Sequence, residues 1–305
     1  MTLSEFTQAW RSRGAHLQIE GKQIFVYERG TRDKPVVLFI HGFPTSGHDW
    51  WRVADQLSDE YRCIALDLPG FGLSDKPVFY SYSLFQQADV VEGLARILEF
   101  DAAHVVSHDM GTSVHAELLA RKQRSELSFE IMTSTFLNGS LVKGMAQLTE
   151  FQEMLETPSR LKDAAARCAV MLPSYVQSLQ RLMEDPSVVS DEDAVVMTDL
   201  LRYNDGHLRL PNIYAYVRER YLIGPMWLES LVAETNPIQL VWGIEDTIAV
   251  VDMARTLAAK MPSAQLTELP GVGHFVPVEA PSAVAASIRA IAPTGHERSE
   301  QARFA

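Results

Sequence analysis

Asp109 stands in a stretch whose residue types could support nucleophilic catalysis. It is the central residue of Ser107-His108-Asp109-Met110-Gly111, between an apolar strand-like run and a helical pattern. In a nucleophile elbow, small residues two before and two after the nucleophile let the strand and the helix pack closely around a strained turn. Ser107 and Gly111 meet that need, so a carboxylate nucleophile is predicted at Asp109. An aspartate at this point could also be only a helix N-cap.

Two further residues follow in the chain order that such a nucleophile requires. Asp246 comes just after the strand expected at 238–242, and His274 lies in a glycine-rich loop after the last expected strand. An acid that orients a histidine, and a histidine that takes up a proton, complete a catalytic triad. Taken singly, Asp246 could form a turn, His274 could be a solvated side chain, and Glu245 is a competing acid. The order nucleophile, acid, histidine, each at a strand's carboxyl end, favours the triad.

The segment His41-Gly42-Phe43-Pro44 follows the strand expected at 35–40. The backbone amides of Phe43 and Met110 are expected to converge on one developing oxyanion. Each such donor in a dry site is worth on the order of 3 kcal/mol in the transition state. Gly-Phe-Pro is also typical of a simple turn.

A carboxylate nucleophile restricts the reaction. When it displaces a leaving group at an sp3 carbon it forms an alkyl ester, and water activated by a histidine can hydrolyse that ester at the carboxyl carbon. A serine would form an ether, which the histidine could not hydrolyse. We therefore expect epoxide opening or carbon–halogen cleavage more than ordinary ester hydrolysis.

Short β-rich runs alternate with helical patterns, which indicates an α/β fold with a mostly parallel central sheet flanked by helices. Strands are expected at 23–27, 35–40, 61–66, 104–107, 129–135, 238–242 and 265–269, and helices at 83–100, 110–122, 251–260 and 281–291. Between 141 and 230 the chain shows helical patterns and prolines without a convincing strand. We expect a core domain at 1–140 and 231–292, an inserted helical cap at 141–230 and a flexible tail at 293–305.

Composition excludes several classes of function. The 305 residues include 39 acidic and 27 basic side chains and carry a net charge of -12, which argues against nucleic acid or an anionic membrane as the main partner. The two cysteines, Cys63 and Cys168, do not suggest a disulfide framework, so a reducing, cytoplasmic location is expected. No apolar run has the length of a signal sequence or a membrane span. No metal-ligand cluster or complete dinucleotide fingerprint occurs, so no metal or cofactor is expected.

Over about residues 20–290 the chain resembles the epoxide hydrolase and haloalkane dehalogenase branch of the α/β-hydrolases. The motifs that carry the resemblance are His41-Gly42-Phe43-Pro44, the segment 67–77, His108-Asp109, Asp246 and His274. Within that branch, the segments 43–50, 107–111 and 204–206 look closest to the mesoderm-specific transcript proteins. The resemblance implies an α/β-hydrolase fold with a helical cap and an aspartate nucleophile.

Two departures from the branch bear on the leaving group. Haloalkane dehalogenases hold the halide with an asparagine and a tryptophan at the positions of Phe43 and Met110, and neither side chain here is a strong donor. Halide release is therefore disfavoured. Epoxide hydrolases also usually carry tryptophan at position 110, so Met110 implies a more flexible and differently shaped pocket floor.

The resemblance to epoxide hydrolases also implies cap tyrosines that donate a hydrogen bond to the ring oxygen. Tyr216 lies at about the position of the second of these tyrosines, with Tyr214 and Tyr221 interpreted as core or surface aromatics. The first would fall near Phe151, where no tyrosine occurs. Tyr175 and Tyr203 are candidates to replace it.

The sequence thus predicts an epoxide hydrolase-like enzyme that converts a small apolar epoxide and water to a diol, with homodimer formation left open. Asp109 attacks, Tyr216 protonates the alkoxide, and His274 with Asp246 activates water. The alternatives are a dehalogenase or a lactone or ester hydrolase with the same triad, and a hydrolase-fold protein that only binds a small apolar ligand. Further substrate-binding candidates are His41, Pro44, His108, Tyr175 and Tyr203.

Overall fold

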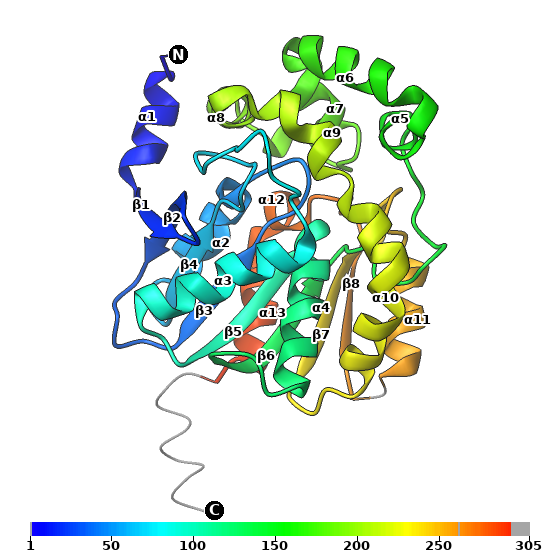
Figure 1. Cartoon of the computed structure of the whole chain (residues 1–305). Coiled ribbons are helices and arrows are strands. Elements are labelled where there is room, and N and C mark those ends of the chain that lie inside the picture. Colours follow the sequence, from blue (N-terminus) through cyan, green and yellow to red (C-terminus); the bar gives the residue numbers. More distant parts are fainter. Residues whose placement is uncertain (1, 262, 294–305) are drawn as a thin grey trace, which may run out of the picture.

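Eight strands form one sheet in the order β1-β2-β4-β3-β5-β6-β7-β8 (Figure 1). The computed structural model describes residues 2–261 and 263–293. Pairing is antiparallel for β1 with β2 and for β2 with β4, and parallel for the other neighbours. The strands are β1 (Gly14–Ile19), β2 (Lys22–Arg29), β3 (Val36–Ile40), β4 (Arg62–Leu66), β5 (Ala102–His108), β6 (Glu130–Leu137), β7 (Ile238–Gly243) and β8 (Gln265–Leu269).

Helices cover both faces of this sheet, which is why strands such as β3, β4 and β7 are buried at every position and are mostly apolar. The helices are α1 (Glu5–Ser12), α2 (Trp51–Leu57), α3 (Leu84–Leu98), α4 (Met110–Gln123), α5 (Glu150–Glu156), α6 (Leu161–Val170), α7 (Tyr175–Gln180), α8 (Asp191–Arg202), α9 (Leu210–Ile213), α10 (Tyr216–Val232), α11 (Val251–Lys260), α12 (Val276–Glu279) and α13 (Pro281–Ile291).

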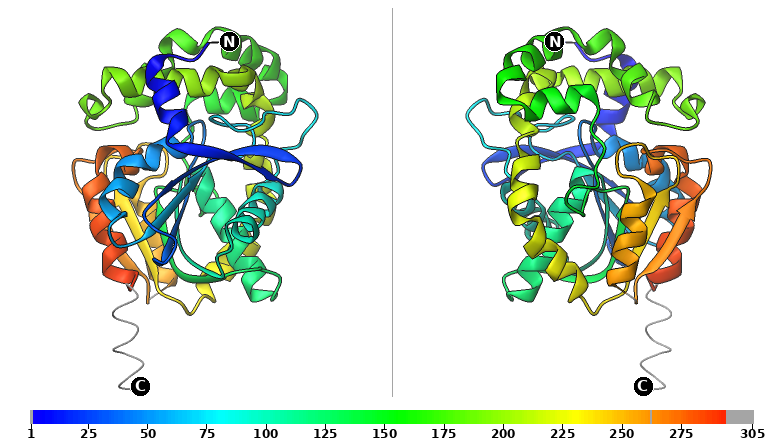
Figure 2. Two further views of the ribbon diagram at one scale, coloured as in Figure 1. Left: turned by 90° about the vertical axis from the view of Figure 1, so that its left-hand side faces the viewer. Right: turned by 90° about the vertical axis from the view of Figure 1, so that its right-hand side faces the viewer.

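The helices α5 to α9, between β6 and β7, lie at one end of the sheet, and α10 runs from there down along the sheet beside α4 (Figures 1 and 2). This is the end at which the parallel strands finish, so the loops after β3, β5, β6, β7 and β8 open toward the helical segment. The division of the chain at residues 141 and 231 stays a prediction. The expected tail at 293–305 lies outside the described residues from 294 onward.

The N-terminal part adds elements that the sequence analysis did not expect. Helix α1 begins at the N-cap Ser4 and is joined to α8 by Asp199, whose Oδ2 accepts from the Ser4 amide at 2.8 Å and from Thr7 Oγ1 at 2.9 Å. Strand β1 then pairs along β2, from Gly14 opposite Tyr27. Helix α2 follows the turn after β3.

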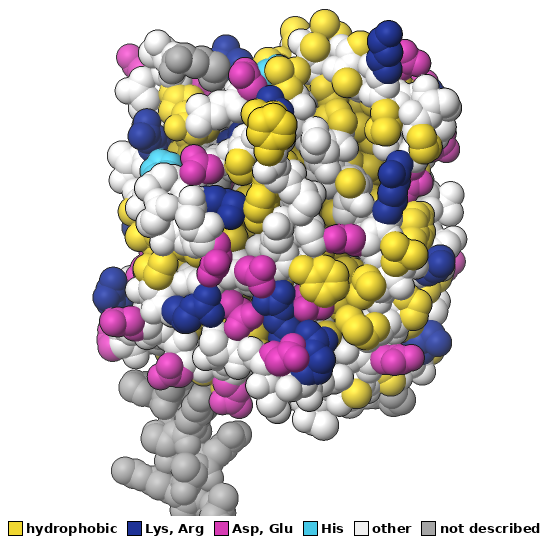
Figure 3. Space-filling view, viewed as in Figure 1, with side chains coloured by type: hydrophobic (Ala, Val, Ile, Leu, Met, Phe, Trp, Pro, Cys, Tyr) yellow, Lys and Arg dark blue, Asp and Glu magenta, His cyan; other side chains and the backbone are white. Residues whose placement is uncertain are grey.

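Charged and apolar side chains occupy different regions of the surface shown in Figure 3. Figure 3 shows charges of both signs interspersed over α3 and α4, and hydrophobic side chains gathered around α5 to α10. Two of the exposed apolar residues, Leu222 and Met226, lie on α10 itself. No helix within the described ranges is both long enough and apolar enough to cross a membrane.

Helix α10 is fixed to α4 through the buried carboxylate of Glu117. Its Oε2 accepts from Trp227 Nε1 of α10 at 2.8 Å, and its Oε1 accepts from Arg121 Nε at 2.9 Å. Glu117 is 1% exposed. Helix α4 begins beside Asp109, and α10 begins at Tyr216. The contact through Glu117 therefore fixes the position of the N-terminus of α10 relative to that of α4.

Replacing Glu117 with Ala should lower the free energy of unfolding by about 3 kcal/mol, because the buried indole and guanidinium lose their shared acceptor. Urea denaturation measures the change. Glu126→Ala is the control, since its pair with Arg124 is exposed and should be worth less than about 1 kcal/mol. Equal, small losses in both variants would contradict this account of the α4–α10 contact.

Candidate active site

Asp109 lies in the sharp turn between β5 and α4, with φ 49° and ψ -118°. Residues with a side chain rarely adopt this backbone conformation, and strain of this kind is concentrated at functional sites. The Asp109 amide donates to the carbonyl of Leu137 at 3.3 Å. A Cβ at Gly111 would lie 2.5 Å from the carbonyl oxygen of Ile40, so a small residue is needed there. Met110 is the first residue of α4, where amides point outward from the helix.

The turn after β3 directs an amide at this carboxylate. Phe43 N donates to Asp109 Oδ1 at 2.7 Å. Gly42 permits the approach, because a Cβ there would lie 2.4 Å from Asp109 Cβ. The ring of His41 fixes the turn through two hydrogen bonds. Its Nε2 accepts from Leu68 N at 3.0 Å, and its Nδ1 donates to the Gly42 carbonyl at 2.8 Å. Burial lowers the pKa of His41 to about 4, so the ring is neutral.

The structure brings Asp109, Asp246 and His274 together from three separate loops. His274 Nδ1 donates to Asp246 Oδ2 at 2.8 Å, and His274 Nε2 lies 3.7 Å from Asp109 Oδ2. All three side chains are buried. The histidine loop is fixed by backbone contacts, since His274 N donates to the Leu182 carbonyl and His108 Nε2 donates to the His274 carbonyl, both at 2.8 Å.

Asp246 is held at both carboxylate oxygens. Oδ1 accepts from the amides of Ile248 at 2.7 Å and Ala249 at 3.1 Å, while Oδ2 accepts from Asn138 Nδ2 at 2.7 Å as well as from the histidine. Asn138, just after β6, was not identified from the sequence. The available signal was its position as a polar residue at the end of a buried strand, next to Gly139.

Glu245, the competing acid, has a different role in the structure. Its side chain is exposed, and its Oε2 accepts from the amides of Gly271 at 2.9 Å and Val272 at 3.1 Å. Glu245 therefore supports the loop that carries His274, whereas Asp246 contacts the imidazole.

The charges around His274 set its protonation. Burial alone would lower the pKa of His274, but the carboxylates of Asp246 and Asp109 outweigh burial and raise it to about 9. Burial likewise opposes ionisation of Asp246, yet His274 and the hydrogen bonds from Asn138 and the backbone keep the pKa of Asp246 below its usual value. At neutral pH the histidine is therefore a cation between two carboxylates.

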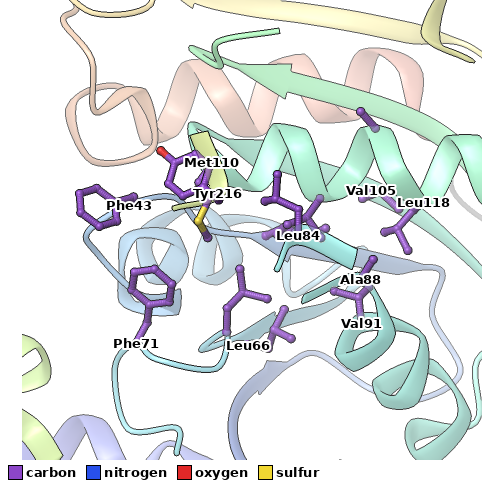
Figure 4. Packing of buried hydrophobic residues seen from close by; sticks show 14 of the residues in the cluster. Phe43, Leu66, Phe71, Leu84, Ala88, Val91, Val105, Met110, Leu118 and Tyr216 are labelled. Carbon is purple, nitrogen blue, oxygen red and sulfur yellow. The ribbon is translucent and has the colours of Figure 1, made fainter. Parts of the chain in front are cut away.

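Two tyrosines lie over this group. Tyr216 begins α10 and is 3% exposed, with its ring centroid 6.2 Å from that of Phe43. Figure 4 shows Tyr216 in the same apolar cluster as Phe43 and Met110. Tyr214, which the sequence analysis set aside, is also buried, with ring centroids 5.6 Å from Tyr216 and 5.2 Å from Phe43. Burial raises the pKa of both phenols.

The two other candidate tyrosines lie in different places. Tyr175 is buried beside the turn after β3 and donates from Oη to the Pro44 carbonyl at 3.1 Å. The structure does not bring Tyr203 to Asp109: its ring faces Lys76 Nζ, 5.1 Å from the ring centroid, and packs against a separate core cluster. The ring of His108 lies against that of His274, with centroids 5.0 Å apart.

A small cavity borders the turn after β3. Asp49, which the sequence analysis did not single out, faces it, and its buried carboxylate accepts a hydrogen bond from Thr45. Burial raises the pKa of Asp49 to about 7. The apolar part of the lining consists of Pro44, Phe71, Tyr175, Met197, Leu200 and Leu201.

Metal binding finds no support in the described part of the chain. No group of three histidine, cysteine, aspartate or glutamate side chains there could hold a metal ion. Cys63 and Cys168 are buried free thiols, and burial raises the pKa of each to about 12. Neither thiol is therefore available as a thiolate at neutral pH.

Comparison with known proteins shows which family this chain belongs to. A family model described as the alpha/beta hydrolase fold matches residues 35–281. The chain belongs to the α/β-hydrolase family. The hydrolase is 35% identical to the putative hydrolase LipZ of Mycobacterium tuberculosis over 92% of this chain and 96% of LipZ. It is 31% identical to the human mesoderm-specific transcript homolog protein over 81% of this chain and 75% of that protein.

Relatives of this hydrolase also include epoxide hydrolases and haloalkane dehalogenases. Epoxide hydrolase 1 of Caenorhabditis elegans is 37% identical over 34% of this chain and 26% of its own length. Among solved structures, the haloalkane dehalogenase DbeA of Bradyrhizobium elkani has a TM-score of 0.75 at 23% identity and covers 91% of this chain and 96% of its own. The resemblance drawn from the sequence motifs is thus confirmed at the level of family and fold.

The raised pKa of His274 predicts a pH dependence of stability. In the unfolded chain this pKa is near 6.5, and in the folded hydrolase it is about 9. The histidine therefore contributes stability that is fully present below pH 6.5 and is lost as the pH rises through about 9. Urea denaturation across this range should show a larger loss for the wild type than for His274→Gln. Parallel losses in the two proteins would contradict a cationic His274.

Proposed function

We propose that this α/β-hydrolase is an epoxide hydrolase that works through a covalent alkyl ester on Asp109. The observation that carries the proposal is the carboxylate at the strained turn: Oδ1 lies 2.7 Å from the Phe43 amide and Oδ2 lies 3.7 Å from His274 Nε2. A carboxylate so placed can attack an sp3 carbon, and its ester then lies within reach of both an oxyanion donor and a base.

In the first step, an Asp109 oxygen forms a bond to a ring carbon of the epoxide while the ring carbon–oxygen bond breaks. The departing alkoxide takes the phenolic proton of Tyr216. Burial raises the pKa of Tyr216, so the phenol is fully protonated before the reaction. Asp109 lies beside cationic His274 and within electrostatic range of Tyr216, so the phenolate forms in the neighbourhood of a cation.

The second step depends on a change of charge. Esterification removes the negative charge of Asp109, which is one of the groups that raise the pKa of His274. The pKa of the imidazole therefore falls, and its proton can pass to the Tyr216 phenolate. Neutral His274 then accepts a proton from water, and the resulting hydroxide attacks the carboxyl carbon.

The tetrahedral oxyanion is stabilised by the amides of Phe43 and Met110. Its collapse breaks the ester carbon–oxygen bond, and the departing oxygen takes the proton of the added hydroxyl group. This releases the diol and restores the Asp109 carboxylate, with the proton from water retained on His274 beside Asp246. One epoxide and one water are consumed for each diol, and no redox partner or metal is required.

Two features favour an epoxide over a halide. Tyr216 supplies a proton that an alkoxide needs and a halide does not. Phe43 and Met110 have no strong side-chain donor for an anion. The apolar lining around Phe71 and Met197 suits a hydrocarbon substituent.

Replacing His274 with Gln should trap the ester, because the general base for its hydrolysis is removed. The variant is incubated with epoxides, bromoalkanes, lactones and esters, and the peptide carrying Asp109 is weighed by mass spectrometry. We expect an increase equal to a whole epoxide.

The double variant with Asp109→Ala is the control and should gain no mass. An increase equal to a bromoalkane less HBr, in place of an epoxide adduct, would assign dehalogenation. If the wild type turns over a compound but the His274→Gln variant forms no adduct with it, the covalent mechanism is wrong. If the wild type turns over none of the compounds but binds apolar ligands, a ligand-binding protein is favoured.

Replacing Tyr216 with Phe should slow alkylation by epoxides roughly 100-fold, because the general acid is lost. Alkylation by a bromoalkane should change little, since bromide leaves without a proton. Single-turnover adduct formation in the His274→Gln background measures both. Tyr80→Phe is the control. It removes a tyrosine hydroxyl outside the candidate active site, from a ring that lies beside Lys22, and should leave both rates unchanged. An equal loss on both substrates would mean that Tyr216 shapes the pocket without donating a proton.

A further inference from the structure

Among the described residues, three basic side chains are buried: Arg62, Lys76 and Arg220. A buried cation is costly unless anionic or polar partners compensate it. Arg62 is paired with Glu28 at 3.0 Å, and Lys76 Nζ donates to three backbone carbonyls. Arg220 is the exception, because its Nη1 has no hydrogen-bond partner within the described part of the chain.

Arg220 is compensated in part by the ring of Tyr216 and by the carboxyl group of Glu156. Burial raises the pKa of that carboxyl group while Arg220 opposes the rise, so the two charges sense one another. No ion pair joins them among the described residues, and Glu156 Oε1 likewise has no hydrogen-bond partner there. The guanidinium thus keeps the capacity to bind an oxyanion through Nη1.

Arg220 lines a small cavity between α10 and the chain that follows β6. Lys143 is a second cation in the lining, with Nζ 5.9 Å from the ring centroid of Tyr221. No acidic side chain of the described residues lines this cavity. The protein as a whole has a net charge of -12. The lining of this cavity is positive instead, because it contains two cations and, among the described residues, no carboxylate.

Two residues that line the cavity are close to residues of the candidate active site. Arg220 lies one helical turn after Tyr216, and its Cζ is 5.3 Å from the Tyr216 ring centroid. On the opposite wall, Ser140 follows two residues after Asn138, which donates to Asp246. Arg220 is thus in contact with the residue proposed as the general acid.

We propose that this cavity binds a carboxylate on the substrate, with Arg220 as its deep partner and Lys143 at the rim. The proposal rests on the epoxide hydrolase activity proposed above and narrows the substrate to an epoxide whose apolar chain ends in a carboxylate. The planar guanidinium fork matches a carboxylate in shape. Leu141 and Val142 supply apolar lining for the chain between the two groups.

The kinetic experiment compares ω-epoxyalkanoates of graded chain length with the corresponding ω-epoxyalkanamides, which differ only in charge. At the best chain length, wild-type kcat/KM should favour the acid by about 10- to 100-fold. Arg220→Met should bring this ratio close to one, and Arg220→Lys should give an intermediate ratio. Arg218→Met is the matched control: the residue lies on the same helix with an exposed side chain, and the ratio should not change.

A second measurement does not need turnover. Isothermal titration calorimetry with plain alkanoates, which carry no epoxide, should show binding to the wild type and to Arg218→Met, and a loss of about 10-fold or more in Arg220→Met. Thermal unfolding of each variant shows whether it is folded, and Arg220→Lys keeps the charge if the methionine variant is not.

The outcomes separate the two proposals. Arg220-dependent binding of alkanoates without any epoxide adduct would remove the proposed hydrolysis and keep the carboxylate site. An acid-to-amide ratio near one in the wild type, or a ratio that is unchanged by Arg220→Met, would overturn the carboxylate site even if epoxides were hydrolysed.

Discussion

The hydrogen bond between His274 and Asp246 is the interaction on which the rest of the site depends. Both groups are buried at the end of an apolar sheet, where an unpaired charge would cost several kcal/mol. The buried pair is stable because Asn138 and two backbone amides also donate hydrogen bonds to the carboxylate of Asp246. These contacts require the loops after β6, β7 and β8 to meet. Gly243 allows that meeting, since a Cβ there would lie 2.2 Å from the carbonyl oxygen of Gly273.

Much of this could be predicted from the sequence, because the decisive signals are local. A buried strand followed by a turn and a helix indicates where Asp109 lies, and strand ends indicate Asp246 and His274. The antiparallel edge was missed because β1 is only partly buried along most of its length and its pattern is weak. Helix α1 depends on Asp199, almost two hundred residues away, a contact that no local pattern reveals.

The missed site residues share a physical reason. The direction in which α10 runs across α4 determines which groups Tyr214 and Arg220 lie beside. Sequence spacing does not show that direction. Asn138 is a single polar residue whose partner, Asp246, lies 108 residues further along the chain. Tyr203 illustrates the converse error, because a tyrosine in the cap segment was considered for its type alone, whereas its ring packs beneath Lys76.

In the proposed mechanism, helix α10 joins selection of the substrate to its chemistry. Its first turns carry Tyr216 and Arg220, and Trp227, further along, is anchored to Glu117 in α4. Helix α4 starts at the residue after Asp109, so the packed helices α4 and α10 together position the proposed nucleophile, the proposed acid and the buried arginine. A carboxylate bound at Arg220 would place the reacting carbon at a distance set by this pair. Chain length, more than bulk, should then decide which epoxides reach Asp109 productively, because effective attack requires the reacting atoms to lie about 3 to 3.5 Å apart.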